Sequence, residues 1–138
     1  MENLLIQINR RLSRDIPRCA KPLGARRVEQ IVSRIKNYIE GNYTDHLTVE
    51  SVAHHVALSP NYLSTLFKRA TGCTVKHFIC EVRIREARRL LSDTTKRVSE
   101  IAYAVGYSSP FYFSRLFKSA TGTSPSEYRH PPGRTSVR

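Results

Sequence analysis

The stretch SPNYLSTLFKRATG, residues 59–72, returns fifty residues later as SPFYFSRLFKSATG, residues 109–122. Ten of the fourteen positions carry the same residue in both copies. Each copy opens with Ser-Pro, which favours the N-cap and the first position of a helix, and closes with Gly, which favours a helix end. The sequence therefore contains one helix-sized unit twice.

Apolar residues recur within each copy at the i, i+3, i+4, i+7 spacing of a buried helix face. The predicted core positions are Leu63, Leu66, Phe67 and Ala70 in the first copy and Phe113, Leu116, Phe117 and Ala120 in the second. The opposite faces differ: they hold Asn61, Ser64, Thr65 and Lys68 in the first copy, and Phe111, Ser114, Arg115 and Lys118 in the second. We infer that the copies fold alike and contact different surfaces, although duplication for packing alone would also preserve a core.

The helix before each copy is repeated as well. Val49, Ala53 and Val56 match Val98, Ala102 and Val105 at a spacing of forty-nine, which places one extra residue in the second turn, around residues 106–108. A short helix, a tight turn and a longer helix with a polar outer face form the helix-turn-helix arrangement, whose second helix enters the major groove of DNA. We expect one such module at 48–72, with Thr48 as a helix cap, and another at 98–122.

Two further helices are predicted. Residues 28–39 carry apolar residues on one face, with a stop at Gly41. A linker helix at 75–91 carries two apolar stripes about 150° apart, where an ordinary surface helix has one. The stripes hold Val75, Phe78, Ile79 and Val82, and Cys80, Ile84, Ala87 and Leu91. We therefore expect an all-α fold in which the linker helix packs its front half in one module and its back half in the other.

The charge of the chain points to a polyanionic partner. The formal net charge is +12 and the pI is near 10.2, which favours nucleic acid first and an anionic membrane surface second. Residues 1–27 contribute +5, residues 28–71 contribute 0 and residues 72–138 contribute +7. No apolar run is long enough to span a bilayer, and three cysteines do not make a disulfide framework, so we expect a cytoplasmic protein with no membrane partner.

The ends of the chain lie outside the helical pattern. Residues 1–25 are predicted to be an arm or linker, interrupted by Pro17 and Pro22. Residues 130–138 are predicted to be a disordered tail.

The outer faces carry groups suited to base recognition. Arg115 can fork to guanine or hold a phosphate, whereas Phe111 can make only apolar contacts, such as with thymine methyl groups. Asn61, Ser64, Thr65 and Ser114 can donate and accept hydrogen bonds, and Lys68 and Lys118 are placed to meet phosphates. Two such helices could enter successive major grooves, about 34 Å apart.

Residues 26–129 resemble the DNA-binding domain of the AraC/XylS family of bacterial transcription regulators. The resemblance is carried by LTVESVAHHVALSPNYLSTLFKRATG, FICEVRIREARRLL and VSEIAYAVGYSSPFYFSRLFKSATGTSPSEYR. It implies about seven helices in two homeodomain-like three-helix units, and base contacts from Asn61, Ser64, Thr65, Phe111, Tyr112 and Arg115. It also implies regulation of promoters, with activation favoured over repression, and contact with RNA polymerase.

The sequence departs from the family pattern in two respects. The first recognition face has no Arg or aromatic residue at 61, 64 or 65. Most family members also carry an effector-binding or receiver domain before the DNA-binding part, and about 25 residues are too few for one. The chain is therefore either a stand-alone member or a fragment of a longer regulator, and a small-molecule effector or receiver domain is expected only if upstream residues are missing.

Other chemistries are not favoured. Cys73, His77 and Cys80 stand at metal-ligand spacing, but no fourth ligand is near and Gly72 ends a helix beside them. No phosphate-binding loop, nucleophile elbow or metalloprotease signature is present in the sequence. We predict no catalytic activity, metal or cofactor. A module that binds another protein, and a nonspecific DNA-binding protein, remain alternatives.

Overall fold

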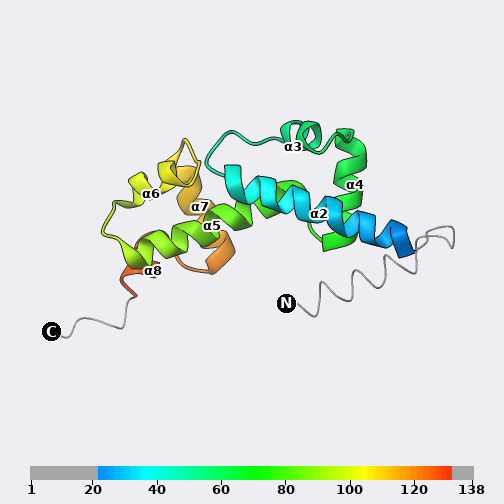
Figure 1. The fold of residues 1–138 in the computed structure, drawn as a ribbon. Helices are drawn as coiled ribbons and strands as arrows, with labels where there is room; N and C mark the ends of the chain where they lie inside the picture. Colours follow the sequence, from blue (N-terminus) through cyan, green and yellow to red (C-terminus); the bar gives the residue numbers. More distant parts are fainter. Residues whose placement is uncertain (1–21, 132–138) are drawn as a thin grey trace. The chain divides into compact units, whose positions relative to one another are not determined.

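The computed structural model describes residues 22–131, and these residues form helices without any strand. The helices are α2 (Pro22–Asn42), α3 (Val49–His55), α4 (Pro60–Thr71), α5 (Val75–Asp93), α6 (Val98–Ala104), α7 (Pro110–Thr121) and α8 (Pro125–Arg129) (Figure 1). The predicted all-α class with seven helices is confirmed for this part of the chain. The predictions for the arm before residue 22 and for the tail after residue 131 lie outside the described residues.

The helices form two compact units that divide α5 between them. Within the described residues, unit 1 comprises 22–42 and 47–79, and unit 2 comprises 43–46 and 80–131. The first five residues of α5 thus belong to unit 1 and the remainder to unit 2. This division agrees with the two apolar stripes predicted for the linker helix.

Unit 1 is a three-helix module closed by the start of α5. The helix α2 packs against both α3 and α4, which pack on each other. Its core consists of fully or almost fully buried residues, among them Ile35, Ile39, Val52, Leu63, Phe67 and Val75. Thr48 caps α3 as predicted, by accepting a hydrogen bond from the Ser51 amide at 3.0 Å, and the Ser51 hydroxyl accepts one from the Thr48 amide. This capping box satisfies two donors that a helix start leaves without partners.

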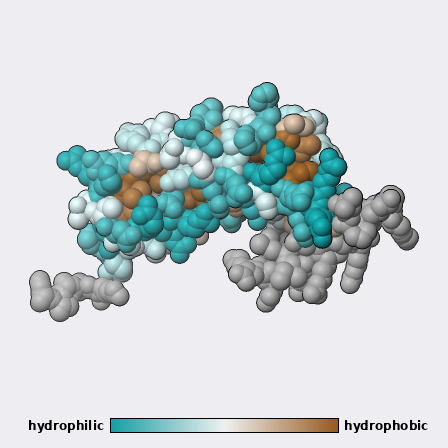
Figure 2. Space-filling view, viewed as in Figure 1, coloured by the Kyte–Doolittle hydropathy of each residue, from teal (hydrophilic) through white to brown (hydrophobic). Residues whose placement is uncertain are grey.

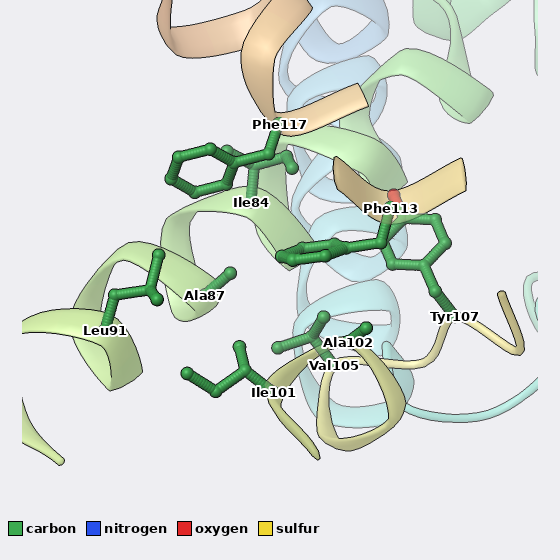
Figure 3. Packing of buried hydrophobic residues seen from close by; sticks show 9 residues of the cluster. All are labelled: Ile84, Ala87, Leu91, Ile101, Ala102, Val105, Tyr107, Phe113 and Phe117. Carbon is green, nitrogen blue, oxygen red and sulfur yellow. The ribbon is translucent and has the colours of Figure 1, made fainter. Parts of the chain in front are cut away.

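Unit 2 repeats this arrangement with α5, α6, α7 and α8. Its core gathers side chains from α5, α6, α7 and the turn between α6 and α7: Ile84, Ala87, Leu91, Ile101, Ala102, Val105, Tyr107, Phe113 and Phe117 (Figure 3). Phe113 and Phe117 are fully buried, and their ring centroids lie 5.8 Å apart. The two rings hold one face of α7 against the rest of the unit.

The repeat extends beyond residues 59–72 and 109–122. In unit 1 the Phe67 ring meets Phe78 edge-on at 5.7 Å, and Lys36 lies over the Phe78 ring. In unit 2 the Phe117 ring meets Tyr128 edge-on at 5.4 Å, and Arg88 lies over the Tyr128 ring. The short helix α8 is therefore the counterpart of the start of α5. By the same spacing of fifty-two that relates Lys36 to Arg88, the second half of α2 corresponds to the second half of α5.

Two predicted helix boundaries near α2 were wrong. Residues 22–25, predicted to belong to the arm, are part of α2, which runs from Pro22 to Asn42. Gly41 lies inside α2, and the helix ends at Asn42, whose side-chain amide donates to the Tyr38 carbonyl at 2.8 Å. The other glycine stops are confirmed: Gly72 and Gly122 cap α4 and α7 in the left-handed conformation.

The predicted core stripe of the second copy is partly wrong. Leu66 and Ala70 are buried, but their counterparts are half-buried Leu116 and exposed Ala120. The difference arises because α2 packs along α4 in unit 1, whereas α7 makes its main helix contacts with α6 and α8.

Both helix-turn-helix turns pass through a left-handed residue, Ala57 in one and Gly106 in the other. In the first turn the amides of residues 57 and 58 donate to the His54 and Ala53 carbonyls. In the second turn the amides of residues 106 and 107 donate to the corresponding carbonyls, those of Tyr103 and Ala102. The turn before α7 is one residue longer than the turn before α4, as predicted.

In unit 2 the turn is held by Arg83 on α5. Its guanidinium donates to the Tyr43 and Asp45 carbonyls, each at 2.8 Å, and lies 5.0 Å from the Tyr107 ring centroid. A Cβ atom added at Gly106 would stand 2.7 Å from the Tyr43 oxygen. Glycine at position 106 therefore permits both the positive φ of 106° and the close approach of residues 43–46.

We expect Gly106→Ala to lower the free energy of unfolding by about 1–3 kcal/mol, because it adds left-handed strain and a steric clash with backbone. Gly41→Ala is the matched control, since no atom lies within 4 Å of its added Cβ. That change should raise stability by about 0.5–1 kcal/mol, as alanine favours helix. Urea denaturation measures both, and equal effects of the two substitutions would contradict the assignment.

Candidate nucleic-acid interface

The outer face of α7 is fixed by what its inner face buries. Ser109 caps the helix by accepting a hydrogen bond from the Tyr112 amide at 3.1 Å, and Pro110 follows in the first turn. With Phe113 and Phe117 fully buried, the side chain of Phe111 is turned outward and is 74% exposed. Because singly exposed apolar residues are normal on protein surfaces, the significance of this ring depends on the side chains beside it.

The exposed face of α7 borders a shallow cavity of about 450 Å³. Its lining residues are Phe111, Ser114, Arg115, Lys118, Ser119 and Ser124. The predicted residues of the second copy therefore come together in one place, except for Tyr112. The cavity combines an apolar ring, two cations and three hydroxyl groups, which suits an anionic partner with apolar edges.

Tyr112 lies beside this face and is 53% exposed. Its ring meets Tyr107 edge-on at 6.2 Å, so its body is supported by the turn before α7. Burial and a hydrogen bond with Cys80 raise the pKa of the Tyr107 hydroxyl well above its ordinary value. Tyr107 is therefore a neutral, structural support and not a titrating group of the surface.

The corresponding face of α4 is polar throughout. Asn61, Ser64, Thr65 and Lys68 are all exposed, on the side opposite buried Leu63 and Phe67. The Ser59 hydroxyl caps this helix by accepting from the Tyr62 amide at 3.2 Å, and the Tyr62 side chain is 54% exposed. The two faces thus share helix position and capping but differ in chemistry, with Asn61 and Thr65 standing where unit 2 has Phe111 and Arg115.

Three neighbouring residues were not among the predicted site residues. Arg69 is exposed beside Lys68 at the end of α4. Ser119, its counterpart, and Ser124 line the cavity on α7. Helical spacing from Thr65 and Arg115 places positions 69 and 119 on the same face, so this signal was available. Ser124 follows α7, and no periodicity reaches it.

The described residues hold no group of three or more His, Cys, Asp or Glu side chains that could bind a metal ion. Cys73, His77 and Cys80 are thus not brought together as ligands. None of the described helices has the length and apolar character that crossing a membrane requires.

Comparison with known proteins identifies the module. A family model described as "Helix-turn-helix domain" matches residues 52–130. The melibiose operon regulatory protein of Escherichia coli K12 is 38% identical over 105 residues, which cover 76% of this chain and 35% of that protein. This chain spans roughly a third of the length of such curated relatives.

Solved structures share the fold. The C-terminal domain of AraT, a response regulator from Geobacillus stearothermophilus, is 38% identical with a TM-score of 0.71, covering 78% of this chain and 93% of that chain. The DNA-binding domain of AdpA in complex with a target DNA is 24% identical with a TM-score of 0.68, covering 71% of this chain and 88% of that chain.

Phe111 and Phe117 provide a test of the two faces of α7. We expect Phe117→Ala to lower the free energy of unfolding by about 3–5 kcal/mol, because it opens a cavity in the core. Phe111→Ala should change it by less than about 0.5 kcal/mol, because that ring contributes little to the core. Thermal or urea unfolding measures both. A large loss for Phe111→Ala would mean that its ring supports the fold.

Proposed function

Because this chain belongs to the AraC/XylS family and carries its helix-turn-helix DNA-binding domain, we propose that α4 and α7 bind double-stranded DNA sequence-specifically in the major groove. The domain extends over residues 26–129 in this proposal, with its modules at 48–72 and 98–122 and the linker helix between them. A helix fits the major groove, which presents distinct donors, acceptors and methyl groups for each base pair.

The single observation that carries the proposal is the composition of the exposed face of α7. Phe111 is 74% exposed and shares one shallow cavity with Arg115 and Lys118. Duplex DNA offers this face both phosphates for its cations and apolar thymine methyl groups for its ring.

Within unit 2 each side chain has a proposed role. Arg115 forks to guanine O6 and N7, and Phe111 contacts a thymine methyl group. Lys118, one turn further along α7, contacts a phosphate that fixes the register. Ser114 and Tyr112 supply hydroxyl groups at the edge of the contact.

Within unit 1 base recognition is polar. Asn61 can bond to adenine at N6 and N7, while Ser64 and Thr65 can bond to either partner of a base pair. Lys68 is assigned to phosphate. We propose that this module discriminates fewer bases than unit 2, because it has neither an arginine nor an aromatic side chain at these positions.

The biological role that fits these contacts is regulation of bacterial transcription in the cytoplasm. Activation is favoured over repression, with RNA polymerase as a second partner, because the operon regulators among the relatives include a protein described as a lactose operon transcription activator. If residues 1–25 connect to an upstream domain, an effector or receiver signal would act through it.

A second candidate function is binding of a protein surface by the same helices. It is favoured by one observation, the 54% exposed Tyr62 on α4, which lies within a stretch, residues 28–71, that carries no net charge. Exposed tyrosine is typical of protein interfaces.

Arg115→Ala is expected to lower specific affinity for DNA by about 1–3 kcal/mol and to relax the preference at one or two base pairs. The control is Arg89→Ala, which removes the same charge from α5, where Arg89 pairs with Glu86 at 3.0 Å. The measurement is selection of duplexes from a random pool, followed by anisotropy titration. An unchanged base preference for Arg115→Ala would contradict the assigned role.

Salt dependence separates the two candidate functions. A protein that neutralises several phosphates should lose orders of magnitude in DNA affinity between 50 and about 200 mM salt. A selected site should also contain two short blocks about one helical turn apart. Weak salt dependence with no enriched sequence would favour the protein-binding function, and equal affinity for scrambled duplexes would favour nonspecific binding.

A further inference from the structure

A basic groove on unit 1 is lined by none of the residues assigned to base recognition. It has a volume of about 720 Å³ and is formed by the first half of α2 and the turn between α3 and α4. Its lining residues are Gly24, Arg26, Arg27, Gln30, Ile31, Arg34, Val56, Ala57 and Leu58. In the space-filling view, a patch of apolar surface on the right of the molecule is bordered by strongly hydrophilic surface (Figure 2).

The groove has the chemistry of an anion-binding surface. Arg26, Arg27 and Arg34 are all exposed, and among residues 22–131 no acidic residue lines the groove. Positions 26, 30 and 34 recur every four residues, so two of the arginines and Gln30 follow one side of α2. Arginine is the side chain best suited to phosphate, because its planar fork can donate two parallel hydrogen bonds.

The position of the groove is defined by the turn that it includes. Residues 56–58 lead directly into α4, which begins at Pro60 and presents Asn61 in its first turn. The groove therefore lies at the N-terminal end of the helix proposed to enter DNA. The major groove is about 12 Å wide and is bordered by a phosphate strand on each side, so an end of an inserted helix is close to a strand.

The N-terminal end of α4 has no cation of its own. Its cations, Lys68 and Arg69, lie in its last turn. Residues 28–71 as a whole carry no net charge. The arginines of α2 supply the cations that the N-terminal end of α4 lacks.

Unit 2 places its cations differently from unit 1. At the spacing of fifty-two that relates the second half of α2 to the second half of α5, the counterpart of Arg34 is Glu86, while Arg26 and Arg27 lie before the part of α2 that the repeat includes. In unit 2 the cations are instead on the recognition helix, as Arg115 and Lys118. Arg34 is thus not part of what the duplication repeats.

We propose that Arg26, Arg27 and Arg34 form a clamp for the DNA backbone, which binds phosphates beside the N-terminal end of α4. The clamp rests on the proposed function and extends it, by assigning the anchoring of the weakly discriminating module to α2. It adds affinity without adding base preference, since phosphate contacts position a protein and carry no sequence information. The apolar side chains of the groove wall support the arginine stems.

The test uses the whole chain and the duplex that the unsubstituted protein enriches from a random pool. Arg27→Gln, Arg34→Gln and the double variant are titrated by anisotropy at several salt concentrations. The slope of log affinity against log salt should become shallower by about 0.9 for each arginine removed. A fourfold rise in salt should therefore weaken binding roughly 3.5-fold less for each single variant, and roughly 12-fold less for the double variant, than it does for the unsubstituted chain. The base preference should stay unchanged, and phosphate ethylation should stop interfering at positions flanking the block bound by unit 1.

Arg89→Gln is the matched control for loss of one charge, and thermal unfolding verifies that each variant folds. Slopes and interference patterns equal to those of the unsubstituted chain would overturn the clamp, and would leave the groove to a protein partner. A shifted base preference would also overturn it, because the arginines would then read bases. If the unsubstituted chain shows no sequence preference, the proposed function itself fails, and the clamp fails with it.

Discussion

Burial of two aromatic rings one helical turn apart determines what the second unit presents to its surroundings. Phe113 and Phe117 are fully inaccessible, with ring centroids 5.8 Å apart. Because a helix turns once every 3.6 residues, fixing these two positions sends Phe111, Arg115 and Lys118 outward. Leu63 and Phe67 impose the same phase on α4. The interface proposed for DNA is thus a consequence of the core and depends on it for its geometry.

Features that act over a few residues could be predicted from the sequence. The serine caps and terminal glycines of α4 and α7 work through neighbouring backbone groups, so their letters suffice. The outward positions on both helices followed from helical spacing for the same reason. Gly41 and Pro22 were misread because glycine and proline often interrupt a helix but can also be part of one, as both are in α2. The length of α2 depends instead on packing within unit 1.

Features that depend on distant parts of the chain could not be predicted in this way. Exposure of Ala120 follows from which helices pack on α7, and the identical letter at Ala70 is buried because α2 covers α4. The basic groove joins residues about thirty positions apart, from α2 and from the turn at residues 56–58. A repeat in the sequence specifies similar helices, but it does not specify that their neighbours are alike.

The contacts of Arg83 bear on how this chain can be dissected. Residues 43–46 stand between α2 and α3 in the sequence, yet they belong to unit 2, where Arg83 donates to the carbonyls of Tyr43 and Asp45. A fragment cut at the α4–α5 junction would retain all the helices of unit 2 and lose both acceptors. The boundary of autonomous folding therefore differs from the boundary of the duplication, and an excised second module would be missing part of its own structure.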